Sequence, residues 1–153
     1  MKTLVMLLLG LAALGRVAHA DQSLVASLDA RRVVTETGGV EKLVPADVAR
    51  PADVVEYRTT YQNVSKKPLA NVAATLPIPA GFVFLAGTAT RGALASLDGK
   101  TYAAMPLTRR VKGADGREQV VEIPAAEYRF LRWQLGDLPA DASRVVVARM
   151  RME

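Results

Sequence analysis

The clearest pattern in the chain is an alternation of hydrophobic and polar positions between Val54 and Asn63. Tyr57 and Tyr61 fall on one side of this segment, whereas the charged residues Glu56 and Arg58 fall on the other. A period of two residues with one charged side is typical of a strand that is buried on one face. We therefore predict a half-buried β-strand over this segment.

Similar short runs continue along the chain, and none shows a long helical spacing of apolar positions. Asp98-Gly99 and Asp115-Gly116 each predict a tight hairpin turn, and two prolines make residues 43–52 a connection or at best an edge strand. The predicted strands lie within residues 24–37, 54–63, 70–76, 82–89, 94–102, 108–123, 128–135 and 144–152. About seven to nine strands at these intervals predict an all-β fold, either an antiparallel sandwich or a barrel.

Two strands near the C-terminus bear on packing. The lone tryptophan, Trp133, shares one side of its predicted strand with Leu131 and Leu135, so we predict that it anchors the core rather than binding a ligand. The last strand, from Arg144 to Met152, carries alternating arginine and methionine at its end. We predict that it lies at a sheet edge, where the arginines oppose aggregation, with a role as a donated strand as the alternative.

The first twenty residues have the organisation of a signal peptide. Lys2 precedes an apolar run of eleven residues, Leu4 to Leu14, and the triplet Ala18-His19-Ala20 follows. A membrane-spanning helix needs about 20 apolar residues, so this run is too short for a permanent anchor, although an uncleaved anchor stays the alternative. We predict cleavage after Ala20, a periplasmic or extracellular location without stable membrane insertion, and a single domain over residues 21–153.

The predicted mature domain lacks histidine and cysteine, because the one histidine is His19. This excludes Ser-His-Asp and Cys-His nucleophiles, and zinc, copper, iron or haem held through those residues. Asp137 and Asp141 are the closest apolar-flanked carboxylates, but both lie in a predicted turn, where aspartate is expected. The lysines lie in polar stretches, which disfavours a buried cross-linking lysine, and no calcium-loop motif occurs. We predict that the protein is not an enzyme and holds no cofactor or metal.

Charge indicates the kind of partner. Without residues 1–20 the chain has 18 basic and 15 acidic residues, a net charge of +3. The basic residues form pairs rather than a stripe, which disfavours nucleic acid. We predict a recognition surface at polar turn positions, with an anionic surface polymer as its natural partner; its residues are Lys66, Lys67, Arg109, Arg110 and Lys112.

Three segments carry motifs beyond simple alternation. Residues 53–63 read DVVEYRTTYQN, residues 70–84 contain ANV and LPIPAGFVF, and residues 131–139 read LRWQLGDLP. They resemble the D-x-V-x-Y start, the A-x-N-V and L-P-x-G-x-x-F middle, and the W-x-L-G-x-L-x-P end of the conserved repeat domain, a bacterial surface-protein repeat of unknown function. The resemblance covers most of residues 50–153 and implies an immunoglobulin-like sandwich, with residues 91–123 longer than in a typical repeat.

Two functions from different classes stay open. The first is a non-catalytic module of the bacterial envelope that uses loops or an exposed edge strand to bind an envelope protein or a surface polymer. The second is a periplasmic assembly factor or fibre subunit that completes the sheet of a partner by strand addition.

Overall fold

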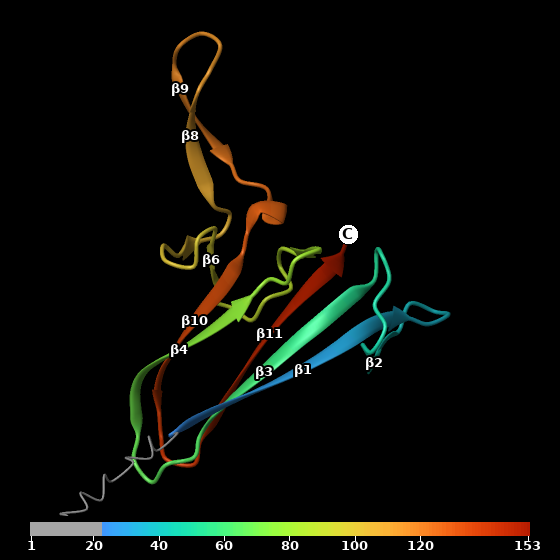
Figure 1. Ribbon diagram of the computed structural model, residues 1–153, viewed down its shortest axis with the longest axis vertical. Helices are drawn as coiled ribbons and strands as arrows, with labels where there is room; N and C mark the ends of the chain where they lie inside the picture. The colour runs from blue at the N-terminus through green and yellow to red at the C-terminus, as the bar shows by residue number, and fades with distance from the viewer. Residues whose placement is uncertain (1–22) are drawn as a thin grey trace, which may run out of the picture.

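The computed structural model describes residues 23–153, and the predicted signal peptide lies outside the described residues. Within this range antiparallel sheets pack together as a β-sandwich, which confirms the predicted fold class (Figure 1). The described range holds eleven strands rather than about seven to nine, because short segments also pair where no alternation is visible. Its helical content is one short turn at Ala125–Glu127, and no helix there has the length and apolarity to cross a membrane.

The larger sheet has five strands in the order β2-β1-β3-β11-β5, all antiparallel. β3 lies at its centre, because it pairs with β1 on one side and with β11 on the other. β2 pairs with the last five residues of β1 and forms part of the sheet edge, as the prolines predicted. The strands are β1 (Leu24–Thr35), β2 (Glu41–Pro45), β3 (Val54–Asn63), β5 (Phe82–Phe84) and β11 (Ser143–Met152).

The smaller sheet has the order β4-β10-β6-β7. Its two long strands are β4 (Leu69–Pro77) and β10 (Phe130–Leu138), and its short ones are β6 (Leu94–Ser96) and β7 (Ala103–Ala104). The pairing of β4 with β10 shifts register at Gly136, whose φ of 70° is readily adopted by glycine. Such a register shift is typical of a β-bulge, which bends its strand locally.

A third, two-stranded sheet is formed by β8 (Thr108–Lys112) and β9 (Glu118–Glu122). It confirms the hairpin predicted at Asp115-Gly116, although the turn has five residues, closed by a 2.8 Å hydrogen bond from the Gly113 N–H to the Arg117 carbonyl. The hairpin projects from one end of the sandwich (Figure 1). We call residues 108–122 the arm.

The hydrophobic core lies between the two larger sheets. Phe84, Leu131, Met150 and Trp133 are among its buried side chains. Burial of each such side chain contributes about 1.5–3 kcal/mol. Trp133 is only 2% exposed and donates its indole N–H to the Thr90 carbonyl at 2.9 Å, which confirms its predicted place in the core.

The C-terminal strand lies inside its sheet. β11 pairs with β3 over residues 143–151 and with β5 over residues 150–152. The chain after β5 continues along β11, where the Val147 N–H donates to the Thr90 hydroxyl at 2.8 Å. The prediction that this strand is a sheet edge is therefore wrong, because residues 82–90 cover residues 147–152 on the side expected to be open. Its role as a donated strand stays a prediction.

Candidate functional site

The arm is among the most exposed elements of the described chain. Residues of both strands are exposed or half-buried, and Val120 is 67% exposed. Isolated two-stranded hairpins are marginally stable in water, so the arm depends on its attachment to the sandwich. Below the arm, the Ile123 N–H donates to the Leu107 carbonyl at 2.8 Å, and both side chains are buried. The arm is thus firmly held where it begins and ends, and its strands lie in solvent.

Charges on the arm are nearly balanced. Residues 108–122 contain four basic and three acidic side chains. The Arg109 guanidinium lies 2.9 Å from the Glu127 carboxylate, and the Arg110 guanidinium lies 3.5 Å from that of Glu118. Since these acidic partners neutralise both arginines, the arm presents a mixed polar surface with exposed valine rather than a cationic one.

The structure separates the five residues of the predicted recognition surface. Arg109, Arg110 and Lys112 lie on β8, whereas Lys66 and Lys67 lie in the turn between β3 and β4 at the opposite end of the long axis (Figure 1). The five residues therefore do not form one continuous surface. The role of each group in recognition stays a prediction.

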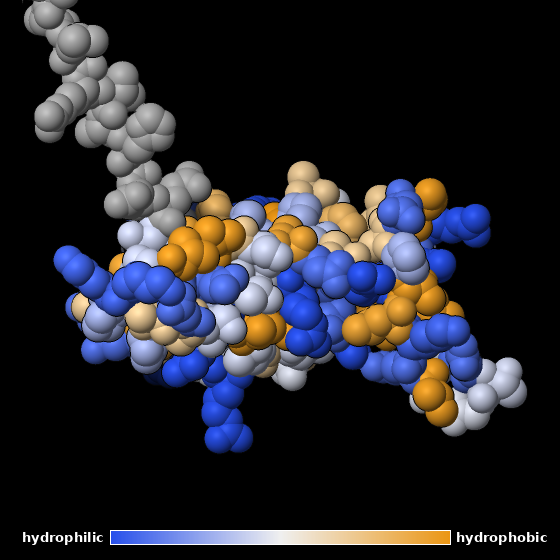
Figure 2. All heavy atoms as spheres, turned by 90° about the horizontal axis from the view of Figure 1, so that it is seen from below, coloured by the Kyte–Doolittle hydropathy of each residue, from blue (hydrophilic) through white to orange (hydrophobic). Residues whose placement is uncertain are grey.

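The lysine turn borders a hollow of about 530 Å³, lined by Ser23, Val64, Ser65, Lys66, Lys67, Pro68 and Leu69. The Lys66 ammonium lies 3.0 Å from the Asp141 carboxylate, and both groups are largely exposed. Seen from this end, apolar side chains form small separate patches among polar ones (Figure 2). The hollow is open, and the Asp141 carboxylate neutralises the charge of Lys66 at its border. This arrangement favours no particular anionic ligand.

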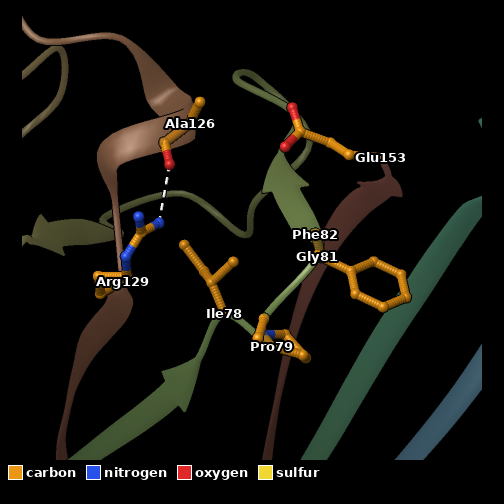
Figure 3. Close-up of a pocket in the computed structure, with 8 residues that line it drawn as sticks. Ile78, Pro79, Gly81, Phe82, Ala126, Arg129 and Glu153 are labelled. Carbon is orange, nitrogen blue, oxygen red and sulfur yellow. Dashed lines mark hydrogen bonds between the residues drawn. The ribbon is translucent and has the colours of Figure 1, made fainter.

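A second hollow, of about 360 Å³, lies at the Pro/Gly corner between β4 and β5. Figure 3 shows Ile78 within it and Arg129 and Glu153 on different sides, and Arg129 donates to the Ala126 carbonyl at 2.8 Å. Its lining residues are Ile78, Pro79, Ala80, Gly81, Phe82, Ala126, Arg129 and Glu153, of which Arg129 and Glu153 carry charge.

The carboxylates considered for catalysis have structural contacts. Asp137 accepts the N–H of Asn71 at 3.1 Å, and Asp141 pairs with Lys66. Asp98 accepts the N–H groups of Thr101 and Lys100, which lower the pKa of its carboxyl below the ordinary value of 3.8. Within residues 23–153, no group of three or more acidic, histidine or cysteine side chains is placed to hold a metal ion.

A charged network lies on the outer face of the larger sheet, away from the core. Arg149 of β11 contacts the carboxylate of Glu56 at 3.0 Å and that of Glu41 at 2.8 Å, and Arg58 contacts Glu56 at 3.2 Å. Burial would lower the pKa of Arg149, but the two carboxylates outweigh it and raise this pKa. Glu56 is 6% exposed, so the expectation of a solvated charged face is wrong at this position.

Sequence reasoning missed an open sheet edge on β1. β3 pairs with β1 over Leu24–Val33, but β2 pairs with it only over Arg31–Thr35. Leu24–Ala30 therefore has no strand on its other side among the described residues, and we call it the open edge. A signal was present in the sequence, since LVASLDA contains neither proline nor lysine, the residues that usually protect an edge.

No known family model, curated protein or solved structure matches the chain.

Proposed function

We propose that the protein is an exported, non-catalytic module of the bacterial envelope that binds an envelope protein through the arm. The observation that carries this proposal is the projection of an exposed hairpin away from a sandwich whose core is complete below it. Little of the arm is buried, so its sequence is not explained by packing. Exposed hairpins and loops on a rigid scaffold are common binding elements.

The charge and apolarity of the arm favour a protein over an anionic polymer. Arg109 and Arg110 are paired with carboxylates, so a polyanion would have to displace Glu127 and Glu118. Val120 lies opposite Arg110 in the β8–β9 register and exposes most of its surface. An apolar centre with a polar rim matches the anatomy of a small protein–protein interface.

The arm can be shortened to its first and last residues while the hydrogen bond between Leu107 and Ile123 below it is kept. Thr108 and Glu122 are direct partners in the register, so an Asn-Gly turn can join them in place of residues 109–121. We expect this variant to keep its melting temperature within a few degrees of that of the unchanged chain and to lose its partner. Unfolding of the shortened chain would show instead that the arm is a structural element.

Site-specific cross-linking in intact cells gives the direct test. A photoreactive residue replacing Val120 should capture one defined envelope protein, which the arm-deleted chain should fail to co-purify. The matched control is Val48, which lies outside the arm and is 69% exposed against 67% for Val120. Equal capture from the two positions would contradict the proposal. If the unchanged chain retained an anionic glycan and the variant Arg109→Glu/Arg110→Glu did not, the result would favour a polymer as the partner.

Strand addition is the second candidate, and the open edge of β1 is the observation that supports it. The strand that pairs with the partner would then be β1, as an acceptor, rather than the C-terminal strand, which the sequence predicted as a donor or an edge. An added strand would hydrogen-bond to the backbone of Leu24–Ala30, as in other cases of β-augmentation.

A further inference from the structure

We infer that the open edge of β1 binds the same edge of a second copy, so that two sandwiches join through one continuous antiparallel sheet. This inference rests on the second candidate function and names its partner. The arm takes no part in the contact, so the proposal for the arm stands or fails separately.

The open edge lacks the devices that keep edge strands apart. It is seven residues long, and its single charged residue is Asp29, whose carboxylate lies 3.0 Å from the Arg31 guanidinium of the same strand. Natural edges are blunted by lysine, proline, bulges or shortness. A regular, nearly uncharged segment of this length therefore offers its free N–H and carbonyl groups to another strand.

The other edge strands of the two larger sheets are short, carry protecting residues or are interrupted. β5 and β7 have three and two residues, and β2 carries Lys42 and Pro45. β4 is the other long edge strand, but Asn71 adopts a φ of 55°, which breaks its extended backbone. Among the described strands, β1 thus provides the longest uninterrupted pairing surface.

The side chains of the open edge form two distinct rows. Leu24, Ala26, Leu28 and Ala30 lie on the same face as the core residues of β3, since they pair in register with Asn63, Tyr61, Thr59 and Tyr57. Leu28 is nevertheless 57% exposed. An apolar row on the core side of the sheet is therefore left partly uncovered.

The sequence of the edge is complementary to itself. A two-fold axis through Ser27 sets Leu24 opposite Ala30, Val25 opposite Asp29 and Ala26 opposite Leu28, and it uses all seven residues. No like charges then face each other, and the apolar rows of both copies lie on one side of the joined sheet. Moving the axis to Leu28 would require Arg31 to pair with Val25, but Arg31 already pairs with Pro45 of β2.

A cysteine at the two-fold axis tests both the contact and its register. The chain has no cysteine, and Ser27 is exposed, so Ser27→Cys introduces one accessible thiol without a core change. In the proposed register two such thiols are directly opposed, with Cα atoms about 4.5–5.5 Å apart, within the range that a disulfide bridges. Mild oxidation of the chain expressed from Asp21 should convert most of Ser27→Cys to a covalent dimer.

The matched control is Val25→Cys, which lies on the same face of the same strand and is also exposed. Its two thiols would lie on opposite sides of the axis, four residues apart along the strands, so they should form far less disulfide. Equal cross-linking at the two positions would overturn the proposed register. A Ser27→Cys chain that stays monomeric would overturn the contact.

Leu28→Lys provides a test without cysteine. Because Leu28 is more than half exposed, this change should leave the melting temperature nearly unchanged while it places charge in the joined apolar row. Analytical ultracentrifugation should show a concentration-dependent dimer for the unchanged chain and at least a tenfold higher dissociation constant for the variant. A monomer at all concentrations, a ladder of larger species, or a dimer insensitive to Leu28→Lys would each contradict the proposal. The arm-deleted chain should dimerise normally.

Discussion

The side-chain amide of Asn63, at the end of β3 in the larger sheet, donates a 3.0 Å hydrogen bond to the carbonyl of Leu138, at the end of β10 in the smaller sheet. The same amide donates to the carbonyls of Pro139 at 2.9 Å and Lys67 at 2.7 Å. Its oxygen accepts the N–H of Ser65 at 2.9 Å. One fully buried side chain thus connects the β3–β4 turn to the β10–β11 turn.

We expect Asn63→Ala to lower the free energy of unfolding by about 3 kcal/mol, because it leaves buried carbonyl groups without donors. Asn63→Asp should cost more, since it replaces the donor with a charged acceptor that faces three carbonyls. Urea unfolding followed by Trp133 fluorescence measures both changes. If Asn63→Asp were as stable as the unchanged chain, the inferred role of the amide donor would be wrong.

The network on the outer face of the larger sheet should also be measurable. We expect Arg149→Met to cost about 3 kcal/mol, because it leaves the nearly buried Glu56 carboxylate with Arg58 as its remaining partner. The control is Arg110→Met, whose exposed ion pair with Glu118 should contribute less than about 1 kcal/mol. Similar losses in thermal or urea unfolding for the two variants would contradict this account of the network.

Two glycines with similar backbone angles should respond differently to alanine. At Gly99, with a φ of 74°, an added Cβ would lie 3.0 Å from the ring of Phe130, whereas at Gly116, with a φ of 77°, it would meet nothing within 4 Å. We expect Gly116→Ala to cost about 1 kcal/mol from the left-handed backbone. Gly99→Ala should lower the free energy of unfolding, measured with urea, by more than Gly116→Ala does, since the Phe130 ring must also move. Equal losses of stability in the two variants would show that the ring moves at no cost.

The pKa of Asp98 predicts a pH dependence of stability. Hydrogen bonds from Thr101, Lys100 and Ser96 lower this pKa in the folded state. The stabilisation by the carboxylate is therefore fully present above the unfolded pKa of about 4 and is lost as the pH falls through the lower, folded value. Asp98→Asn should be less stable than the unchanged chain at pH 7, and this difference should narrow at pH 3 in urea unfolding. A difference that does not change with pH would contradict the prediction.

The local sequence pattern was sufficient to predict those elements whose structure is determined by residues adjacent in the chain. The alternation from Val54 to Asn63 matched β3, and the Asp115-Gly116 turn matched the arm, because in both cases the face or turn is determined by adjacent residues. The burial of Trp133 followed from its leucine neighbours in the same way. These features are encoded within about ten residues of chain.

Features that depend on distant partners were not visible in the sequence. The burial of Glu56 depends on Arg149, 93 residues away, and the interior position of β11 depends on β5 and on Thr90 beyond it. For the candidate site, the sequence singled out basic residues of the arm, but placed Lys66 and Lys67 on the same surface. Turn composition does not specify which end of a sandwich a turn occupies.

The attachment of the arm has a consequence for how the protein can diverge. The chain leaves the sandwich after Leu107 and returns at Ile123, two residues joined by a hydrogen bond. Substitutions, insertions or deletions between these points need not alter any contact of the core. Under changing selection the arm can therefore evolve quickly while the scaffold stays constant. An unrelated hairpin grafted between Thr108 and Glu122 should be carried by a folded support.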